Sequence, residues 1–387
     1  MHPVNLPLVM LAIGAVFFFL VPAIGAFSIR RKWRSFRSRL TSSAASPVAT
    51  YRRLRTGEGT TDQAAIGVFR FFGMLEAILD NDTVWIRDGD VSLSAELNDE
   101  KVYLLATGVA LSEPLDDKKT PVSIPWSKVG SLIEGTKVFI HGTLFTDAGR
   151  AVFRSSPGTP LFVILFDGDE HDLSRRAIWT GRQRNEYWNH LTPASLAVGS
   201  LAMIVAAYVA LNVPGFGYVA RAAVTFGLAP VLPLFPPGVA FFFLYRKLWR
   251  DGRVLRAERD LVMLPITTAL GDHDTAMLPG GEQYVSRVVS REELDGLVAS
   301  GLAIQDVTTR PRDDVQWYAF GRPADGGIAP PEDPIVPGVV IPGEPRRLSI
   351  DCARRARSYE IFALLVFFAG LVTNMALVFF LLGYVVP

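Results

Sequence analysis

The sequence is poor in cysteine and, over four long stretches, free of charge. Cys352 is the only cysteine among 387 residues, which excludes an intramolecular disulfide and a cysteine-rich zinc site. Asp, Glu, Lys and Arg are absent from residues 3–29, 191–213, 222–245 and 361–387. A helix needs about 20 residues to cross the hydrocarbon core, and a central charge costs roughly 2.5–3.5 kcal/mol. The four stretches therefore predict a membrane protein with about four crossings.

The third stretch also lacks a continuous helical pattern, because it carries Pro230, Pro233, Pro236 and Pro237. Proline is tolerated in the first helical turn but not in a helix interior. We therefore expect transmembrane helices at 1–29, 191–213, 236–250 and 359–387. Residues 214–235 are expected to form an outer loop or a segment that re-enters the membrane.

Basic residues flank these stretches on one side only. The clusters are Arg30, Arg31, Lys32 and Arg34 after the first stretch, Arg246 and Lys247 after the third, and Arg354 and Arg355 before the fourth. On the opposite side Arg221 is the only basic residue. By the positive-inside rule, four crossings place both termini outside and both soluble portions in the cytoplasm, which suits a bacterial inner membrane.

The basic clusters also bear on partners. Because they adjoin every crossing, attraction to anionic lipid headgroups explains them better than nucleic-acid binding does. A cleaved signal peptide, with a cleavage site near residues 23–26, is the alternative for the first stretch. No Lys or Arg precedes that stretch and six follow it within ten residues, which favours an uncleaved anchor.

The first soluble portion, residues 41–190, predicts an all-β domain. Runs rich in β-branched and aromatic residues occur at 66–73, 83–87, 91–97, 137–142, 150–153 and 161–166. Asp80-Asn81-Asp82, Arg87–Asp90 and Asp147-Ala148-Gly149 supply turn signals between them. This pattern favours an OB-like barrel, with a β-sandwich as the alternative.

The second soluble portion, residues 251–322, predicts a smaller α+β domain. Ser290–Glu293 is a capping box that precedes a short helix, and Gly301 is its expected end. Proline recurs from 323 to 345. That segment is expected to be extended and poorly packed, either as a tether to the last helix or as a peptide for a partner.

One segment resembles a known family. Residues 134–142 (EGTKVFIHG), followed by a hairpin and an apolar strand that leads to a membrane helix, resemble the β-rich "beside a membrane" domain of the mitochondrial-type membrane ubiquitin ligases and their prokaryotic relatives. The resemblance implies a β-rich domain next to the bilayer. Ligase activity in that family needs a zinc-binding RING, which one cysteine cannot supply. Residues 181–189 and 236–238 also resemble parts of uncharacterised bacterial multi-pass membrane proteins, which implies no activity.

Catalytic and cofactor signals are few. The acidic run that contains Asp167, Asp169 and His171 could bind a hard cation, but it lacks EF-hand spacing and reads better as a solvated turn. His141, alone after apolar residues, is expected to be a partnered structural histidine. Cys352 beside arginines raises acylation as a possibility, with an inert interfacial cysteine preferred. The sequence contains no nucleophile elbow, phosphate-binding loop or zinc-protease motif, so we expect no cofactor.

Asn374 is the most polar side chain within the crossings and is expected to form a helix–helix contact. These observations favour a non-enzymatic membrane scaffold or accessory subunit that presents its cytoplasmic domains to a protein partner or to a second copy. The alternative is a membrane-embedded enzyme or lipid-handling protein with a site near residues 230–237, since broken helices often line cavities.

Overall fold

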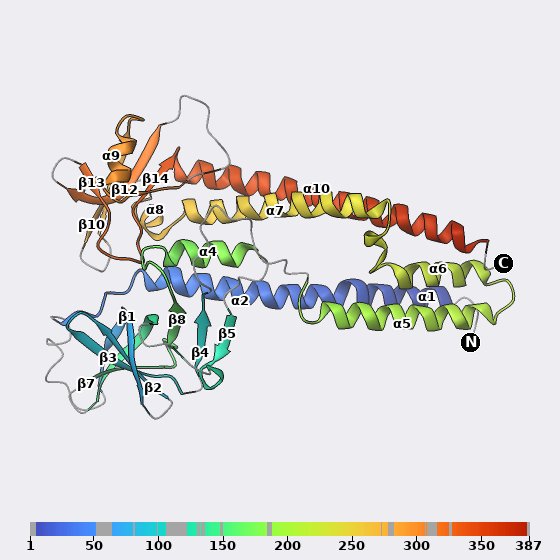
Figure 1. Cartoon of the computed structure of the whole chain (residues 1–387), viewed down its shortest axis with the longest axis horizontal. Helices are drawn as coiled ribbons and strands as arrows, with labels where there is room; N and C mark the ends of the chain where they lie inside the picture. Colours follow the sequence, from blue (N-terminus) through green and yellow to red (C-terminus); the bar gives the residue numbers. More distant parts are fainter. Residues whose placement is uncertain are drawn as a thin grey trace. The chain divides into compact units, whose positions relative to one another are not determined.

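The computed structural model describes residues 5–51, 64–79, 82–98, 100–105, 122–129, 132, 136–147, 150–183, 188–271, 273–277, 282–305, 307, 316–324 and 327–384. The chain divides into two compact units (Figure 1). The helical unit comprises Met1–Ser35, Asn185–Arg256 and Ala353–Pro387, and the β-rich unit comprises Phe36–Arg184 and Ala257–Cys352. Both soluble portions therefore belong to one unit.

Long apolar helices build the helical unit. Its elements are α1 (Asn5–Ile13), the π-helix η1 (Gly14–Leu20), α2 (Val21–Ser43), α5 (Thr192–Leu211), α6 (Gly217–Leu228), the 3-10 turn η3 (Leu232–Leu234), α7 (Gly238–Val262) and α10 (Pro345–Leu382). Within the described residues, three helices are long and apolar enough to cross a membrane: Leu6–Ser43, Thr192–Leu211 and Pro345–Leu382. They coincide with three of the four expected crossings. A chain with membrane-length helices and a β-rich region is thereby confirmed.

The third apolar stretch differs from the expectation. Residues 217–228 form the helix α6, and the expectation that this segment is an outer loop or re-enters the membrane stays a prediction. α7 begins at Gly238, directly after the proline pair, and continues to Val262, beyond the expected end at residue 250. Gly227 of α6 lies against Met203 and the Ser200 carbonyl at the middle of α5, whereas Val219 and Ala210 share an apolar cluster nearer the end of α5. Thus α6 runs antiparallel to α5 and ends halfway along it, where the prolines interrupt the helical hydrogen bonds.

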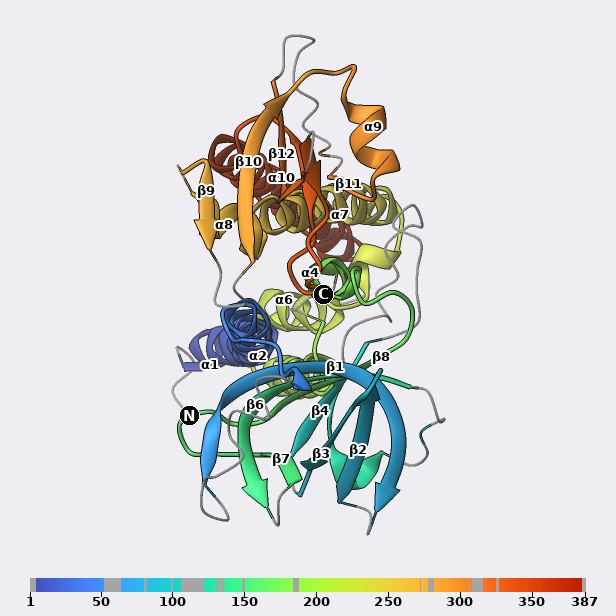
Figure 2. The ribbon, with the colours of Figure 1, turned by 90° about the vertical axis from the view of Figure 1, so that its left-hand side faces the viewer.

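The first sheet of the β-rich unit contains a closed ring of strands. Its strands are β1 (Ala65–Leu79), β2 (Thr83–Asp88), β3 (Val91–Glu96), β4 (Lys101–Leu104), β5 (Val122–Pro125), β6 (Lys137–Asp147), β7 (Arg150–Arg154) and β8 (Phe162–Phe166). The order β1-β2-β3-β7-β6 closes by pairing of β6 with β1, and β6-β8-β4-β5 continues outward. The long strand β1 pairs with β6 through its first part and with β2 through its last (Figure 2).

Alternation along these strands fills the inside of the ring. Phe71, Leu75, Ile86, Leu144 and Phe153 are all buried in one core. Two-residue connections join β2 to β3 and β6 to β7, since Asp88 pairs with Val91 and Asp147 with Arg150. The hairpins predicted from the turn signals at 87–90 and 147–149 are confirmed.

The outer face of β1, β6 and β8 carries a second apolar layer, built from aromatic rings. Phe72, Phe139 and Phe162 pack edge to face or tilted against one another, and Phe36 from α2 covers Phe162 at a centroid distance of 5.6 Å. The last turns of α2 therefore dock on the barrel. The short η2 (Trp126–Lys128) and α4 (Leu173–Gln183) complete this portion.

The second soluble portion is a mixed sheet with short helices. Its elements are α8 (Pro265–Leu270), β9 (Thr275–Met277), β10 (Gln283–Val289), α9 (Leu294–Ala299), β11 (Ala303–Ile304), β12 (Trp317–Ala324), β13 (Gly327–Ala329) and β14 (Val339–Pro342). The strand order is β11-β14-β12-β10-β9, with β13 paired to β12. Leu294 and Leu297 of α9 pack on Val289, Ala319 and Val340.

The expected short helix is confirmed as α9, and it ends before Gly301. It begins at Leu294, one residue after the predicted capping box, of which one bond is present: Glu293 Oε2 accepts a hydrogen bond from the Ser290 backbone N–H. Gly301 has a φ of 101°, and the Leu302 N–H donates to the Leu297 carbonyl, which is a Schellman ending. Glycine reaches this φ without the strain that a Cβ would add.

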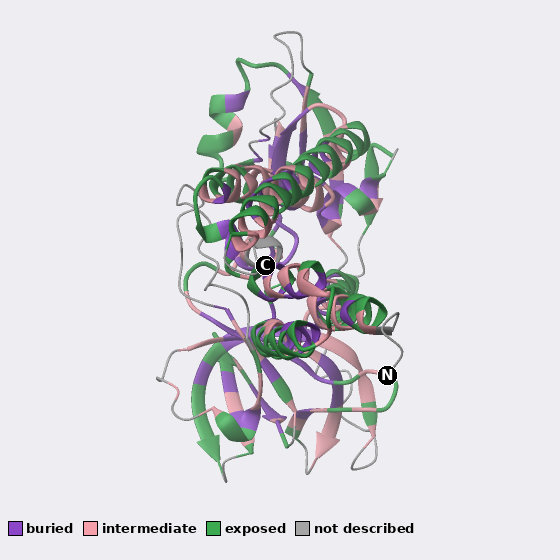
Figure 3. Ribbon diagram, turned by 90° about the vertical axis from the view of Figure 1, so that its right-hand side faces the viewer, coloured by how far each residue is buried: buried purple, intermediate pink, exposed green. Residues whose placement is uncertain are grey.

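The proline-rich segment 323–345 is not a loosely packed tether. Residues 335–342 are all buried, and β14 lies between β11 and β12 inside the sheet. Buried backbone, drawn purple, runs through the strands of the β-rich unit (Figure 3). The prediction from the prolines was wrong for this part of the segment, because the strand residues Val339, Val340 and Ile341 lie between prolines. Those three residues keep their N–H groups for pairing and are apolar enough to fill the core.

Candidate functional site

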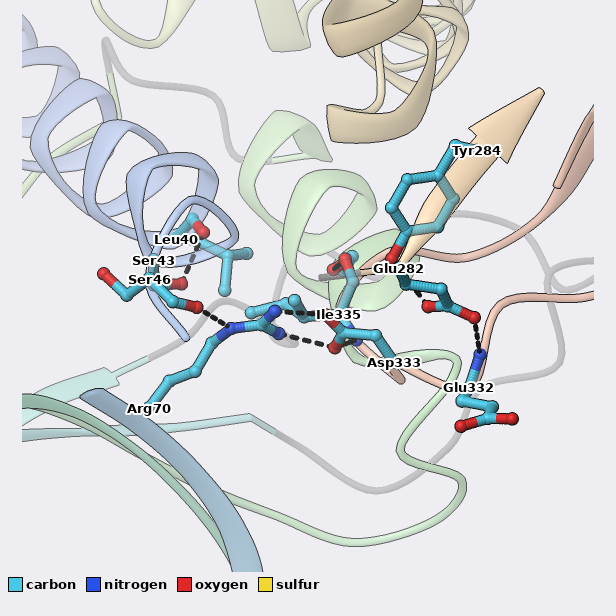
Figure 4. A network of polar contacts seen from close by, with 10 residues as sticks. Leu40, Ser43, Ser46, Arg70, Glu282, Tyr284, Glu332, Asp333 and Ile335 are labelled. Carbon is cyan, nitrogen blue, oxygen red and sulfur yellow. Dashed lines mark hydrogen bonds and ion pairs between the residues drawn. The ribbon is translucent and has the colours of Figure 1, made fainter. Parts of the chain in front are cut away.

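A buried polar cluster joins the two soluble portions within the β-rich unit (Figure 4). We call it the polar junction, and it consists of Ser46, Arg70, Ser174, Glu282, Tyr284, Glu332, Asp333 and Ile335. These residues come from the end of α2, from β1, α4 and β10, and from the segment before β14. Five parts of the chain that are distant in sequence meet at this point.

Arg70 is the centre of the polar junction. Its side chain lies on the outer face of β1, is 1 % exposed, and forms a two-pronged ion pair with the carboxylate of Asp333. Its Nε donates to the Ser46 carbonyl at 2.6 Å. All three guanidinium nitrogens thus have acceptors, which is what a buried arginine requires.

The segment that follows α2 is held against β1 by the backbone of the same residue. The Arg70 N–H donates to the Pro47 carbonyl at 3.0 Å, and the Ala49 N–H donates to the Arg70 carbonyl at 2.8 Å. The side chain and backbone of Arg70 therefore bind the chain on both sides of Pro47. The position of Ser46 is fixed by this strand-like pairing.

Asp333 and its neighbours are held from the other side. Asp333 Oδ1 accepts the Ile335 N–H at 3.1 Å, and Ser174 Oγ of α4 donates to the Ile335 carbonyl at 3.0 Å. Glu282 accepts from the Tyr284 hydroxyl at 2.8 Å and from the Glu332 N–H at 3.1 Å. Burial, and then the hydrogen bond to Glu282, raise the pKa of Tyr284, so its hydroxyl remains a donor.

A row of side chains continues from Arg70 across the outer face of the barrel. Arg70 pairs across strands with His141, and His141 pairs with Phe162, over whose ring Arg39 lies at 4.8 Å. His141 Nε2 is 2.9 Å from Ser46 Oγ. Burial lowers the pKa of His141 to about 4, and the positive charges of Arg39 and Arg70 contribute. His141 is therefore neutral at pH 7 and has the partner that the sequence analysis expects.

This arrangement fixes position and does not perform chemistry on its own. Removing one member of a buried ion pair costs roughly 3–5 kcal/mol, because the other charge is left without a partner. The polar junction thus joins the two soluble portions through one buried charged pair together with the hydrogen bond from Ser174 to Ile335. Its chemical capacity is to hold two folded portions as one body.

The weak metal candidates are engaged in local contacts. Asp167 pairs with Arg176 at 3.2 Å, and Asp169 accepts the backbone N–H of His171 at 3.1 Å. Within the described parts of the chain, no group of three or more His, Cys, Asp or Glu residues could hold a metal ion. Asp167, Asp169 and His171 together form a turn between β8 and α4.

The membrane-surface candidates lie on helices. Arg31, Lys32 and Arg34 on α2, Arg246 and Lys247 on α7, and Arg354 and Arg355 on α10 are exposed, and Arg30 is partly exposed. Cys352 is fully buried, so its thiol is not presented to an acyl donor.

Asn374 on α10 is buried in the helical unit, at the interruption between α6 and α7. Its Nδ2 donates to the carbonyls of Leu232 at 2.5 Å and of Phe235 at 2.8 Å. A comparable bond occurs elsewhere, where Ser195 Oγ of α5 donates to the Phe17 carbonyl of η1 at 2.5 Å. Both side chains reach backbone carbonyls of other helical elements.

Sequence reasoning missed the pairing of Arg70 with Asp333. The available signal was the position of each charge. Arg70 is the only charge within the apolar run 66–73, and Asp333 stands directly before Pro334 in a segment rich in apolar residues. A lone charge in a strand that reads as buried predicts a partner of opposite sign. The sequence does not identify that partner 263 positions away.

The comparisons with known proteins add no identity. No protein-family model matches the chain, and no curated protein matches it.

Proposed function

We propose that this protein is a non-enzymatic membrane scaffold or accessory subunit, whose β-rich unit binds a protein partner on the cytoplasmic side of an inner membrane. The polar junction is the observation that carries the proposal. It joins the barrel, the end of α2, α4 and the second sheet through a buried ion pair and its hydrogen bonds. A surface whose parts are already fixed loses less entropy when a partner binds.

The proposed topology has four crossings with both termini outside. α6 and α7 together would form the third crossing. The 12 residues of α6 and the eight uncharged residues 238–245 of α7 give about 18 Å and 12 Å at 1.5 Å per residue, close to the hydrocarbon thickness of about 30 Å. The exposed basic residues on α2, α7 and α10 would then meet anionic headgroups.

Arg221, on the proposed outer side, fits this topology. It lies in the first turns of α6, and its guanidinium carbon is 5.5 Å from the centroid of the Phe379 ring in the last turns of α10. The negative end of the α10 dipole and the ring face both favour a cation there.

The proposed fold of the first soluble portion is an OB-like barrel. The closed order β1-β2-β3-β7-β6, with its one parallel pair between β3 and β7, supports this assignment over a sandwich. Such a barrel, followed in the chain by the membrane-length helix α5, also agrees with the resemblance of residues 134–142 to the "beside a membrane" domains. The resemblance supports a structural role and carries no ligase activity.

The end of β1 is the proposed contact surface for the partner. Met74, Ile78 and Leu79 are 50 %, 42 % and 50 % exposed, although their strand belongs to the ring. Apolar side chains grouped on a surface commonly mark sites of protein association.

Photo-crosslinking in the native host tests the partner proposal. A photoreactive amino acid at Ile78 of the full-length protein is expected to give one discrete adduct. The same group at Asp88, at the opposite end of β2, is the control and is expected to give none. Equal labelling at both positions, together with a monomer in mild detergent, would overturn the proposal.

Cysteine labelling in intact cells tests the topology separately. With Cys352 replaced by Ala, single cysteines placed at Glu100 and Ser300 should react with a membrane-impermeant reagent only after the cells are opened. Labelling of either position from outside contradicts the four-crossing arrangement.

A further inference from the structure

The interruption between α6 and α7 lies at the middle depth of the helical unit. Gly227, just before it, contacts the Ser200 carbonyl, and Ser200 is close to the midpoint of the membrane-length helix Thr192–Leu211. Asn374 reaches the interruption from the apolar part of α10. If α5 crosses the bilayer, as the proposed topology requires, the interruption is far from both water layers.

Proline chemistry explains why a polar side chain is needed at this depth. Pro236 has no N–H to donate to the Leu232 carbonyl, four residues earlier. Phe235 supplies a 3-10 bond at 3.1 Å instead, and Asn374 Nδ2 adds a second donor. Its other amide hydrogen goes to the Phe235 carbonyl. The Phe235 carbonyl also accepts the Val239 N–H at 3.0 Å, so Asn374 adds a second donor to each carbonyl where lipid offers none.

The oxygen of the same amide, Asn374 Oδ1, lacks a hydrogen-bond donor among the described residues. Asn374 is 2 % exposed, and its Oδ1 is buried without a hydrogen-bond partner among the described residues. Both amide hydrogens point to carbonyls, which fixes which end of the amide is oxygen. A buried acceptor with no donor costs about 1–3 kcal/mol, and such atoms in native proteins are commonly satisfied by water.

The start of α7 adds positive character to the same place. Gly238, the first residue of α7, packs so tightly on Asn374 that a Cβ at this position would lie 2.2 Å from Nδ2. The N–H groups of Val239 and Ala240 already donate to the Phe235 and Pro237 carbonyls, so the start of this 25-residue helix contributes the positive end of its dipole. An acceptor atom of a ligand is favoured there, next to an amide oxygen that needs a donor.

We propose that Asn374 Oδ1 is a binding site for one hydroxyl group at the middle of the membrane. A hydroxyl donates its hydrogen to Oδ1, and the positive end of the α7 dipole favours its oxygen lone pairs nearby. Water is the smallest source of such a group, and the free hydroxyl of a diacylglycerol-type lipid is the other. All residues of this site belong to the helical unit. The helical unit would then bind a polar group in addition to anchoring the protein in the membrane.

A high-resolution cryo-EM map of the full chain in lipid nanodiscs tests the proposal, with an antibody fragment bound as a size marker. We expect density that belongs to no protein atom within about 3.2 Å of Asn374 Oδ1. Two lipid preparations distinguish the sources. A compact peak in nanodiscs of phosphatidylglycerol and phosphatidylethanolamine indicates water, and elongated density that appears only when diacylglycerol is added indicates a lipid hydroxyl.

The wild-type map decides the question even if substitutions at Asn374 prevent folding. A protein donor on Oδ1, or no density near it in either preparation, overturns the site. Where it folds, Asn374→Leu should lose the density, whereas Thr373→Val, a matched change at the neighbouring exposed position, should keep it. A failure of the four-crossing topology would appear independently in the cysteine labelling at positions 100 and 300.

Discussion

The apolar stretches of the helices and the polar junction satisfy their buried polar groups in different ways. In the helical unit, neutral side chains donate to backbone carbonyls, as Ser195 does to Phe17 and Asn374 does to Leu232. In the β-rich unit, a charge meets a charge, because Arg70 is buried against Asp333. A charge inside an apolar crossing is costly, whereas a soluble core can bury a pair whose remaining donors find carbonyls.

Proline determines where the helical unit uses these donors. In the π-helix η1, a backbone N–H donates to the carbonyl five residues earlier, as the Val21 N–H does to the Val16 carbonyl. The corresponding donor for the Phe17 carbonyl would be residue 22, but Pro22 has no N–H. Ser195 supplies the missing hydrogen bond. Pro236 creates the same need at Leu232, and Asn374 meets it. Both of these proline defects thus have a polar side chain from another segment of the unit.

The largest expected effect concerns the ion pair of the polar junction. Arg70→Met leaves Asp333 buried without its partner and should reduce the free energy of opening of β14 and the segment before it by roughly 3–5 kcal/mol. Hydrogen exchange of the full-length protein in detergent, read by mass spectrometry for residues 333–342, measures this change.

Two further variants serve as controls for Arg70→Met. Arg70→Met combined with Asp333→Leu removes both charges and should restore most of the lost protection. Arg87→Met removes an exposed pair with Glu76, 3.5 Å apart, and should change protection by less than about 1 kcal/mol. If Arg70→Met behaves like Arg87→Met, the polar junction does not hold the two portions together.

The next effect in size concerns Asn374. Asn374→Leu removes two hydrogen bonds, at about 0.6–1.7 kcal/mol each, and leaves the Leu232 and Phe235 carbonyls with one backbone donor apiece. We expect a lower thermal midpoint of the detergent-solubilised protein and faster exchange at residues 232–240. Thr373→Val is the matched control, since Thr373 is exposed and bonds only within its own helix. Equal midpoints for both variants would contradict the role of Asn374.

A smaller effect is expected at Ser195. Ser195→Ala removes one hydrogen bond to the Phe17 carbonyl and should cost about 0.6–1.7 kcal/mol. Ser200→Ala, on the same helix, serves as the control for loss of a hydroxyl. Steric-trap or thermal unfolding of the full chain measures both. Pro22→Ala restores a backbone N–H that can donate to the Phe17 carbonyl. The loss of stability caused by Ser195→Ala should therefore be smaller in the Pro22→Ala background. An equal loss in both backgrounds would show that Ser195 does not compensate for the proline.

The sequence was sufficient for features set by local chemistry. Charge-free length predicted three helices, alternation and turn residues predicted the strands and hairpins of the barrel, and Ser290 to Gly301 marked α9. It was insufficient where distant segments meet. The burial of Val339–Ile341 depends on a sheet gap that only β11 and β12 together create, and the pairing of Arg70 with Asp333 depends on the same docking. The many prolines of residues 323–345 led to the prediction of an extended, poorly packed segment. Composition alone does not show that the residues between the prolines keep N–H groups for strand pairing.

The smallest effect at neutral pH concerns His141, and it appears only on acidification. Its pKa is lowered to about 4 in the folded protein, against an ordinary value of 6.5, by burial and by Arg39 and Arg70. The unfolded chain therefore takes up a proton below pH 6.5, whereas the folded protein does so only near pH 4. The stability that neutral His141 provides is complete above pH 6.5 and declines as the pH falls from 6.5 to 4.

Hydrogen-exchange protection of β6 in His141→Gln should match the wild type more closely at pH 4.5 than at pH 7.5. His171→Gln changes an exposed histidine and should follow the wild type at both pH values. A pH profile of β6 that is the same with and without His141 would show that this histidine is not held neutral by the two arginines.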